Sequence, residues 1–415
     1  MKLTKEEKNW ILYDVGNSAF TLLIATIIPL YFNYLAEQAG LSSVDYLAYW
    51  GYAASVATLF VVFIGPVFGT LADTKGFKKP VFSVALAVGA AACVLMGFAK
   101  QWLVFLVIYV IAKTGYSASL IFYDSMLADV TTAERMDQVS SQGYAWGYIG
   151  SCVPFVVCLM IVLGAGKLGI SMELAMGISF FVTAAWWVLM TVPMLKTYRQ
   201  KNYVERKPHA FRESFARIGK TFLNVRKEKK IFLFLLAFFF YIDGVYTIID
   251  MATAYGSALG LDSTGLLLAL LVTQIVAFPC AILFGRLARR FRTEHLITVC
   301  VMAYIGIALF ACVLRTQTQF WILAIFVGMF QGGIQALSRS YYAKIIPAEQ
   351  SGEYFGLLDI CGKGASFIGT AIVSVVSQLT GDINKGVAMI VVLFVVGVVL
   401  FRIAVTCVQK NKIES

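Results

Sequence analysis

Charged residues are scarce in this chain. Asp, Glu, Lys and Arg together make up 14% of the 415 residues, whereas hydrophobic residues make up 60%. Roughly a quarter of the residues in a soluble domain are charged, so the composition excludes an ordinary soluble protein. The apolar residues gather in runs of about 20, the length of a helix that crosses a bilayer, and the short alternating segments of a membrane barrel are lacking. The sequence predicts an all-α polytopic membrane protein.

The residues that most often do chemistry are also scarce. The two histidines, His209 and His295, fall in loops, and the eight cysteines stand singly in or beside apolar runs without a CxxC pair or metal-ligand spacing. Neither a nucleophile elbow nor an ATP-binding P-loop occurs. An integral-membrane enzyme would need such a constellation, so we expect no enzymatic activity, no cofactor and no metal site.

The positive charge is concentrated in alternate loops. The net charge is +11, and 28 of the 34 Lys and Arg residues fall on one side of the predicted topology. Cationic loops stay in the cytoplasm, so both termini are predicted to be cytoplasmic. The charge therefore indicates membrane topology and attraction to anionic lipid heads, not a nucleic-acid partner. The opposite loops carry only Lys100, Lys167, Arg315 and Lys385.

One long polar segment divides the chain. Twelve basic residues and three Glu give residues 196–230 a net charge of +9, with six apolar runs on either side. We predict an amino-terminal six-helix bundle (1–195), a basic cytoplasmic linker (196–230) and a carboxy-terminal six-helix bundle (231–415). An amphipathic linker helix is predicted from the shared face of Phe211, Phe215, Ile218, Phe222 and Val225.

Polar residues inside two predicted helices of the first half mark candidate sites. Asp14 and Asn17 share one face of the first helix, although Asp14 could instead be solvated at the interface. Lys113 falls near the middle of the fourth helix, with Tyr116 close to its face. An ionisable residue at this depth is costly and usually faces protein or water, and pairing for packing alone is the alternative.

Three helices of the second half carry further candidates. Asp243 and Asp250 are seven residues apart and therefore share a helical face with Tyr246. In the tenth predicted helix, Gln331 and Gln335 lie on one face. In the eleventh, Asp359 and Lys363 are four residues apart, a spacing that permits an ion pair with either a structural or a functional role.

A glycine-rich loop follows the second predicted helix. Residues 69–80, GTLADTKGFKKP, resemble the loop between helices 2 and 3 of the major facilitator superfamily, with Thr74 and Phe77 as departures. GRLAR at 285–289 repeats GTLAD at 69–73 after a constant offset of 216 residues. This repeat predicts two pseudo-symmetric six-helix units. Because Arg289 replaces the acid, we expect a carboxylate latch in the first copy only.

Several blocks together resemble one branch of that superfamily, the group similar to the autophagy-related vacuolar amino-acid effluxer. They are YDVGNSAF at 13–20, VSSQG at 139–143, YIDGV at 241–245 and QGGIQALSRS at 331–340. The resemblance implies twelve transmembrane helices, with helices 1, 4, 7 and 10 lining a cavity, and alternating access of the two halves. The short tails are similar to the compact bacterial form, so the bacterial cell membrane is the expected location.

In that cavity one cation and two carboxylates would suit a zwitterion such as an amino acid. We expect Lys113 to hold a substrate carboxylate, Asp243 or Asp250 an ammonium group, and the remaining acid a coupling proton. Substrate contacts are also expected from Asn17, Tyr116, Tyr246, Gln331 and Gln335, proton coupling also from Asp14 and Asp359, and gating from Gly69, Asp73, Gly76, Lys78, Arg135 and Arg339. We expect a monomer that uses a small-molecule substrate and a proton or another coupling ion. The alternatives are a lipid or lysolipid transporter with the same fold and a non-transporting receptor with the same fold.

Overall fold

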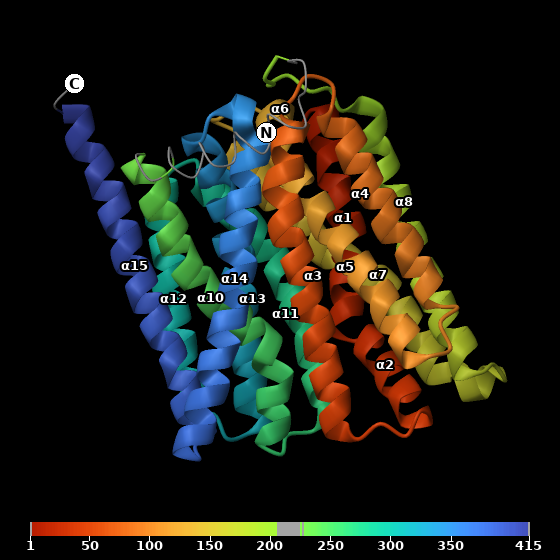
Figure 1. The fold of residues 1–415 in the computed structure, drawn as a ribbon. Coiled ribbons are helices and arrows are strands. Elements are labelled where there is room, and N and C mark those ends of the chain that lie inside the picture. Colours follow the sequence, from red (N-terminus) through yellow and green to blue (C-terminus); the bar gives the residue numbers. More distant parts are fainter. Residues whose placement is uncertain (1, 206–224, 226–227, 414–415) are drawn as a thin grey trace. The chain divides into compact units, whose positions relative to one another are not determined.

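Twelve spans of α-helix dominate the computed structural model, which describes residues 2–205, 225 and 228–413 (Figure 1). Each span is long and apolar enough to cross a membrane, which confirms the predicted twelve-helix fold. The first six spans are α1 (Lys5–Ala25) with α2 (Ile27–Gln38), α3 (Ser43–Ala72), α4 (Lys78–Met96), α5 (Trp102–Ser125) with α6 (Leu127–Val130), α7 (Met136–Leu168) and α8 (Met172–Thr197). The last six are α10 (Lys229–Ala258), α11 (Ser263–Leu287), α12 (Thr293–Cys312), α13 (Gln317–Ile345), α14 (Ser351–Thr380), preceded by the short 3-10 turn η1 (Ala348–Gln350), and α15 (Ile383–Ile413).

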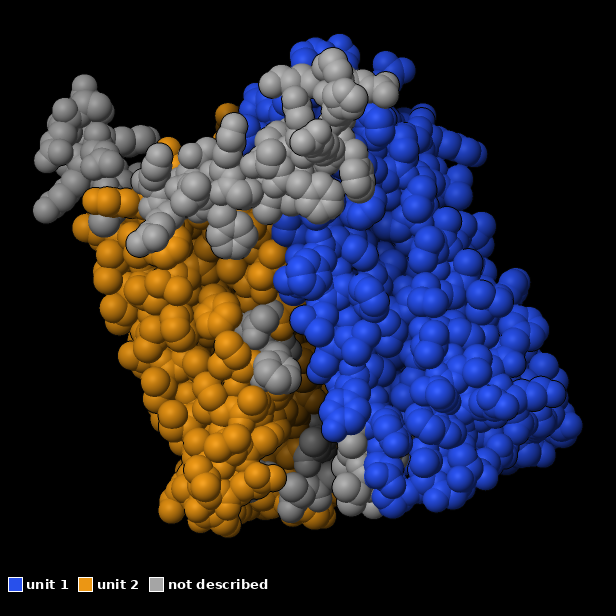
Figure 2. Space-filling view, viewed as in Figure 1, with its two compact units in different colours: residues 1–131, 146–214, 348–356 blue, residues 132–145, 215–347, 357–415 orange. Residues whose placement is uncertain are grey.

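The chain folds into two compact units, which Figure 2 colours separately. Unit 1 comprises residues 1–131, 146–214 and 348–356, and unit 2 comprises residues 132–145, 215–347 and 357–415. The first turns of α14 thus belong to unit 1, and the first turns of α7 belong to unit 2. The predicted amphipathic linker helix lies outside the described residues, apart from Val225.

The same helix pairs pack together in each unit. In unit 1, α1 packs on α8, α3 on α5, and α4 on both α5 and α8. Unit 2 repeats this pattern in the corresponding spans, with α10 on α15, α11 on α13, and α12 on both α13 and α15. The repeated packing agrees with the two pseudo-symmetric units that the GTLAD and GRLAR repeat predicts.

One hydrogen bond also recurs between corresponding spans. Tyr13 on α1 and Ser119 on α5 bring their hydroxyl oxygens to 2.6 Å, while Tyr241 on α10 and Ser338 on α13 bring theirs to 2.7 Å. Both tyrosines are fully buried, where an unpaired hydroxyl would cost about 1 to 3 kcal/mol. The hydrogen bond therefore fixes the first span of each unit against the fourth.

The first span is interrupted at Thr26, where α1 ends and α2 begins. Pro29 lies four residues after Ala25 and has no N–H to donate to its carbonyl. The Ala25 carbonyl therefore cannot receive its usual helical hydrogen bond. The Thr26 hydroxyl donates to the carbonyl of Leu22, at 2.6 Å, and the span resumes in α2.

Each unit has a basic end, which we define by its Lys- and Arg-rich loops. In unit 1 this end includes the start of α1, the end of α3 and the end of α8. In unit 2 it includes the start of α10 and the loop between α11 and α12. The positive-inside rule assigns the basic ends to the cytoplasm, so the cytoplasmic position of both termini stays a prediction.

Candidate functional site

Asp243 is the most enclosed acid among the predicted substrate and proton sites. Its side chain lies on α10 and is 0% exposed. One carboxylate oxygen, Oδ1, accepts hydrogen bonds from the backbone N–H of Gly369 at 3.0 Å and from the Thr247 hydroxyl at 3.3 Å. The other oxygen, Oδ2, is buried and has no hydrogen-bond partner among the described residues. This environment disfavours a negative charge, because both donors bind Oδ1 and none among the described residues compensates for the burial of Oδ2.

Gly369 allows α14 to approach this carboxylate. A Cβ added at residue 369 would lie 2.9 Å from Cγ of Asp243 and closer still to the carboxylate and hydroxyl oxygens around it. A side chain at this position would therefore separate α14 from α10. The glycine makes the backbone N–H available to the acid.

The other predicted contacts of unit 2 differ from Asp243 in exposure. Asp250 is exposed, and Tyr246 and Gln335 are half-buried, while Gln331 is 6% exposed. Asp243 and Asp250 share a helix but occupy different environments, one enclosed and one accessible. The two acids therefore suit different chemical tasks.

In unit 1 the predicted polar face of α1 is largely engaged in hydrogen bonds. Asp14 is 5% exposed, and its Oδ2 accepts from the Tyr123 hydroxyl at 2.7 Å. The Asn17 amide donates to Asp14 Oδ1 at 3.3 Å and to the Tyr13 carbonyl at 3.1 Å. Trp10 stacks on the Tyr123 ring at 4.3 Å. Asp14 is therefore buried and not solvated, and it ties α1 to α5.

Lys113 and Tyr116 lie on α5, both half-buried. The Lys113 ammonium lies 5.9 Å from the centre of the Tyr109 ring, within cation–π range. The Tyr116 hydroxyl and Thr21 Oγ1 are 2.6 Å apart. The unit 1 candidates thus form a cation beside aromatic rings, with hydroxyls from α1 and α5 nearby.

Asp359 and Lys363 form the ion pair that their spacing permits. Lys363 Nζ lies 2.6 Å from Asp359 Oδ2 on α14, and both side chains are about one-fifth exposed. The pair neutralises two charges inside a membrane-spanning helix. Its role in proton coupling stays a prediction.

At the basic end of unit 1, Asp73 binds the start of α14. Its two oxygens accept from the backbone N–H groups of Gly352 at 2.7 Å and Glu353 at 2.9 Å. The first N–H groups of a helix lack partners within it and favour a negative charge. Burial raises the pKa of Asp73 to about 6, although Lys78 and the two backbone donors act in the opposite direction.

Lys78 completes this cluster and is fully buried. Its ammonium lies 3.5 Å from Asp73, 3.7 Å from Asp129 and 2.8 Å from Ser351 Oγ. Ser351 in turn donates to the carbonyl of Ser125 at 3.0 Å. One lysine therefore joins the end of α3, the short helix α6 and the start of α14 through charge and hydrogen bonds.

The two predicted gating residues that are glycines, Gly69 and Gly76, are required by different features of the structure. A Cβ at Gly69 would lie 2.8 Å from the Gly352 carbonyl carbon, so only a glycine permits this approach of α3 to α14. Gly76 has φ of 80°, a left-handed conformation that other residues rarely adopt. The former sets a helix contact, whereas the latter shapes the loop.

The described start of the linker is fastened over the same loop. Val204 accepts from the N–H of Lys75 at 3.1 Å and donates to the carbonyl of Asp73 at 2.8 Å. Gln200 donates to the carbonyl of Ala72 at 3.0 Å and accepts from the N–H of Gly76 at 2.9 Å. We call residues 198–205 the linker strap.

Asp129 anchors the linker strap and is a site residue that the sequence argument missed. It is 2% exposed and accepts from the backbone N–H groups of Lys201 at 3.1 Å and Asn202 at 2.8 Å. The Tyr198 hydroxyl donates to its other oxygen at 2.5 Å. An acid at the inner end of the fourth span was visible in the sequence, but its backbone partners were not.

The basic end of unit 2 contains a different charged cluster around Asp137, another acid not predicted as a site. The Lys344 ammonium forms an ion pair with it, and the hydroxyls of Ser340 and Thr293 donate to it at 2.6 and 2.7 Å. The predicted gating residue Arg135 lies two residues before Asp137 and immediately precedes α7.

Arg339, predicted to act in gating, is buried beside this cluster. Its guanidinium donates to Ser140 Oγ at 2.9 Å and to the Ser140 carbonyl at 3.0 Å. It also lies 4.3 Å from the Tyr144 ring centre. Arg289, at the position equivalent to Asp73, donates to Gln138 at 2.7 Å. These contacts fix the first turns of α7 on α13 and on the loop after α11.

Comparison with known proteins places these features in a family. A family model described as "Vacuole effluxer Atg22 like" matches residues 3–414. An uncharacterized MFS-type transporter of Bacillus subtilis, YxiO, is 42% identical over 404 residues, covering 96% of this chain and 94% of the relative. Autophagy-related protein 22 of Cryptococcus neoformans is 28% identical over 315 residues, or 70% of this chain and 54% of that protein.

Solved structures share the fold at low sequence identity. The human organic anion transporter MFSD10 has a TM-score of 0.73 at 13% identity, covering 96% of this chain and all of that one. The Escherichia coli fucose:proton symporter FucP has a TM-score of 0.71 at 15% identity, covering 96% and 97%. These neighbours support the fold that the twelve spans define.

Proposed function

Because the chain belongs to the vacuole effluxer Atg22-like family of the major facilitator superfamily, we propose that it moves a small polar or zwitterionic solute across the membrane by proton-coupled alternating access. An amino acid or a related metabolite is the proposed substrate. The charge types on α5 and α10 support this choice, because Lys113 suits a carboxylate and Asp250 suits an ammonium group. The bacterial relative of nearly equal length supports a location in the bacterial cell membrane.

Asp243 carries the proposal of proton coupling. A carboxylate that is 0% exposed, with one oxygen lacking a partner among the described residues, is held in an environment that favours its neutral form. A proton carrier needs a group that gains and loses a proton during the cycle. We assign the coupling proton to Asp243 and the substrate ammonium to Asp250, since Asp250 is exposed and Asp243 is enclosed.

The proton on Asp243 would also change how α10 holds α14. The ionised carboxylate is the stronger acceptor for the Gly369 N–H. Protonation weakens this hydrogen bond, and it adds an O–H donor that the surrounding site must accommodate. Proton occupancy is thereby linked to the packing of a helix whose first turn is bound by Asp73.

The remaining candidates have supporting roles in this scheme. Asn17, Tyr116, Tyr246, Gln331 and Gln335 would supply hydrogen bonds to the solute, while Asp14 and Asp359 are further proton sites that their existing partners make less available. Gating is assigned to the two basic-end clusters, with Gly69, Asp73, Gly76 and Lys78 in one and Arg135 and Arg339 in the other.

The test is Asp243→Asn in proteoliposomes with an imposed pH gradient. Asn retains an acceptor for the Gly369 N–H but cannot titrate. Proton-driven accumulation of the transported amino acid should fall at least tenfold, while solute exchange at equal pH persists. Asp250→Asn is the matched variant and should instead raise the KM. Unchanged proton-driven accumulation in both variants would contradict the assignment.

The substrate class is tested by thermal unfolding of the purified protein with amino acids, dipeptides, sugars and lysolipids. A ligand that binds the folded state raises its apparent stability. A zwitterion should raise the unfolding midpoint in the wild type but not in Lys113→Ala. A shift with lysolipids alone would favour the lipid transporter and reject the zwitterion.

A further inference from the structure

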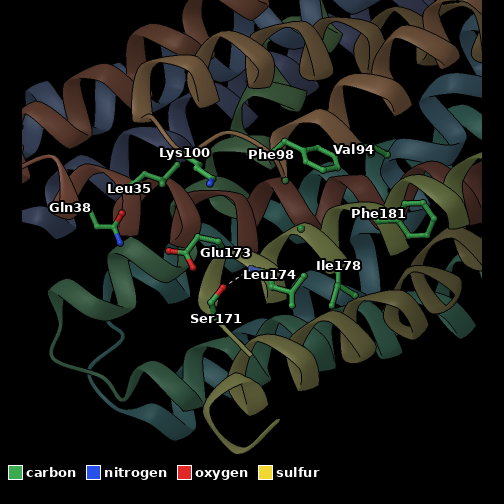
Figure 3. Close-up of a pocket in the computed structure, with 12 residues that line it drawn as sticks. Leu35, Gln38, Val94, Phe98, Lys100, Ser171, Glu173, Leu174, Ile178 and Phe181 are labelled. Atoms are coloured by element: carbon green, nitrogen blue, oxygen red, sulfur yellow. Dashed lines mark hydrogen bonds between the residues drawn. The ribbon is translucent and has the colours of Figure 1, made fainter. Parts of the chain in front are cut away.

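Unit 1 has a cavity at the end opposite its basic end. None of the proposed substrate, proton-coupling or gating residues lines this cavity. It has a volume of about 680 Å³, within the range of small-molecule sites. The ends of α2 and α4 and the start of α8 line it (Figure 3). We propose that this cavity binds a phospholipid whose headgroup carries both a phosphate and a primary ammonium group.

The cavity has a polar part and an apolar part. Figure 3 shows Gln38, Lys100, Ser171 and Glu173 toward one end and Val94, Ile178 and Phe181 toward the other. This gradient matches a lipid headgroup that continues into an acyl chain. A soluble metabolite would leave the apolar part without a complementary group.

Two opposite charges face the cavity without neutralising each other. Lys100 and Glu173 both line it, and no ion pair joins them in the described part of the chain. The Tyr34 hydroxyl donates to Glu173 and so orients its carboxylate. A lysine suits a phosphate and a carboxylate suits an ammonium group, so a zwitterionic headgroup would satisfy both.

Exposed apolar side chains lead away from this site along two helices. On α8, Leu174, Phe181 and Val188 are spaced by seven residues, so they share a face, and they are 53%, 60% and 37% exposed. On α4, Val88 and Leu95 have the same spacing and are 43% and 53% exposed. In a chain of twelve membrane spans such faces meet lipid. Exposed apolar side chains therefore extend from the cavity along both helices.

Glycines bring these two helices together beside the cavity. A Cβ at Gly97 would lie 2.7 Å from Cα of Gly177, and both glycines line the cavity. The close approach leaves the space beside the crossing without side chains from either position. The cavity is consequently a feature of how α4 and α8 cross.

The proposal predicts a preference among headgroups. Phosphatidylglycerol has the phosphate but only neutral hydroxyls in place of the ammonium group, so it offers no positive charge to Glu173. Phosphatidylcholine has a quaternary cation that cannot donate a hydrogen bond to the carboxylate. We expect phosphatidylethanolamine to bind most tightly of the three.

Native mass spectrometry of the purified full chain with these three lipids tests the preference. Wild-type protein should retain phosphatidylethanolamine at least tenfold more strongly than Lys100→Ala or Glu173→Gln does. Lys167→Ala is the matched control, because Lys167 is exposed on the same side in the predicted topology but does not line the cavity. It should bind like the wild type.

A charge reversal gives a second readout that does not depend on lost binding. Glu173→Lys places two cations at the cavity and should invert the preference toward phosphatidylglycerol. Equal retention of all three lipids by the wild type, or an equal loss in Lys167→Ala, would overturn the proposal. Competition by glycerophosphoethanolamine at the same concentration as the lipid would also overturn it, because that result would indicate a site for a soluble zwitterion.

Discussion

In unit 1 the loop after the second span supplies a carboxylate, Asp73, whereas the corresponding loop of unit 2 supplies a guanidinium, Arg289. Asp73 is fully buried and accepts from two backbone N–H groups of α14. The Arg289 side chain is exposed and donates a hydrogen bond to the side chain of Gln138. At the basic end of unit 2 the buried acid is Asp137, on the first turn of α7. The duplicated helices thus kept their packing while their charges were rearranged.

The comparison shows which interactions stabilise each charged cluster. Unit 1 uses a side chain against backbone donors, and its lysine is completely enclosed. Unit 2 uses side chains against side chains, with Lys344 24% exposed. The unit 1 cluster therefore depends more on burial and on how closely the backbone of α14 approaches Asp73. The unit 2 cluster depends more on the identity of the side chains around Asp137.

Removing the two lysines should give the largest contrast. Lys78→Met leaves Asp73 and Asp129 buried without their cation and should lower the free energy of unfolding by about 3 to 5 kcal/mol. Lys344→Met removes a partly exposed cation and leaves Asp137 with two hydroxyl donors, and we expect a loss of about 1 to 2 kcal/mol. Denaturant unfolding in detergent measures both, and an equal loss would remove the contrast.

The glycines that allow the helices to approach should differ in whether they can be rescued. Gly69→Ala meets the backbone of Gly352 and should cost about 1 to 3 kcal/mol. Gly285→Ala meets Cβ of Ser141 at 2.7 Å, so adding Ser141→Gly should recover much of its loss. Thermal unfolding of the single and double variants tests this. Failure of Ser141→Gly to restore stability would place the obstruction elsewhere.

The raised pKa of Asp73 gives unit 1 a pH dependence. The folded state holds this proton up to about pH 6, whereas the unfolded carboxyl releases it near 3.8. The contribution of this proton is therefore present below about pH 4 and is lost as the pH rises to about 6, with a size of about 2 to 3 kcal/mol. Unfolding midpoints measured from pH 4 to 7.5 should lose this component in Asp73→Asn and retain it in Asp137→Asn.

The linker strap should have the smallest effect, confined to unit 1. Gln200→Ala removes hydrogen bonds to Ala72 and Gly76 at a cost of about 0.5 to 1.5 kcal/mol. Backbone amide hydrogen exchange should increase in residues 73–78 and stay unchanged in residues 286–292 of unit 2. An increase in both segments would show that the linker strap is not a local fastening.

Sequence reasoning predicted the twelve spans because each leaves an apolar run of sufficient length. It also predicted the Asp359 and Lys363 pair, since both partners lie within one helical turn. The partners of Asp73 are backbone N–H groups that lie 279 and 280 residues further along the chain. Backbone donors leave no mark in the residue types, so no pattern could identify them.

Asp129 and Asp137 were missed for a related reason. Asp129 lies at the end of the fourth predicted span and Asp137 lies in the predicted loop after it, and an acid at either position is ordinarily solvated. The linker strap encloses Asp129, and Lys344, Ser340 and Thr293 surround Asp137. Enclosure by segments far away in sequence is a property of the tertiary fold and not of local spacing.

The glycine contacts of α14 have a kinetic consequence. Gly65 approaches Gly356, and Gly69 approaches Gly352, so α3 and the first turns of α14 meet backbone to backbone. At these two glycine pairs neither residue has a side chain whose rotamer must change before the surfaces separate. The hydrogen bonds of Asp73 and Ser351 must also break, so they contribute to the activation barrier to separation. A single carboxylate can thus affect how fast this contact opens, as well as how often it is open.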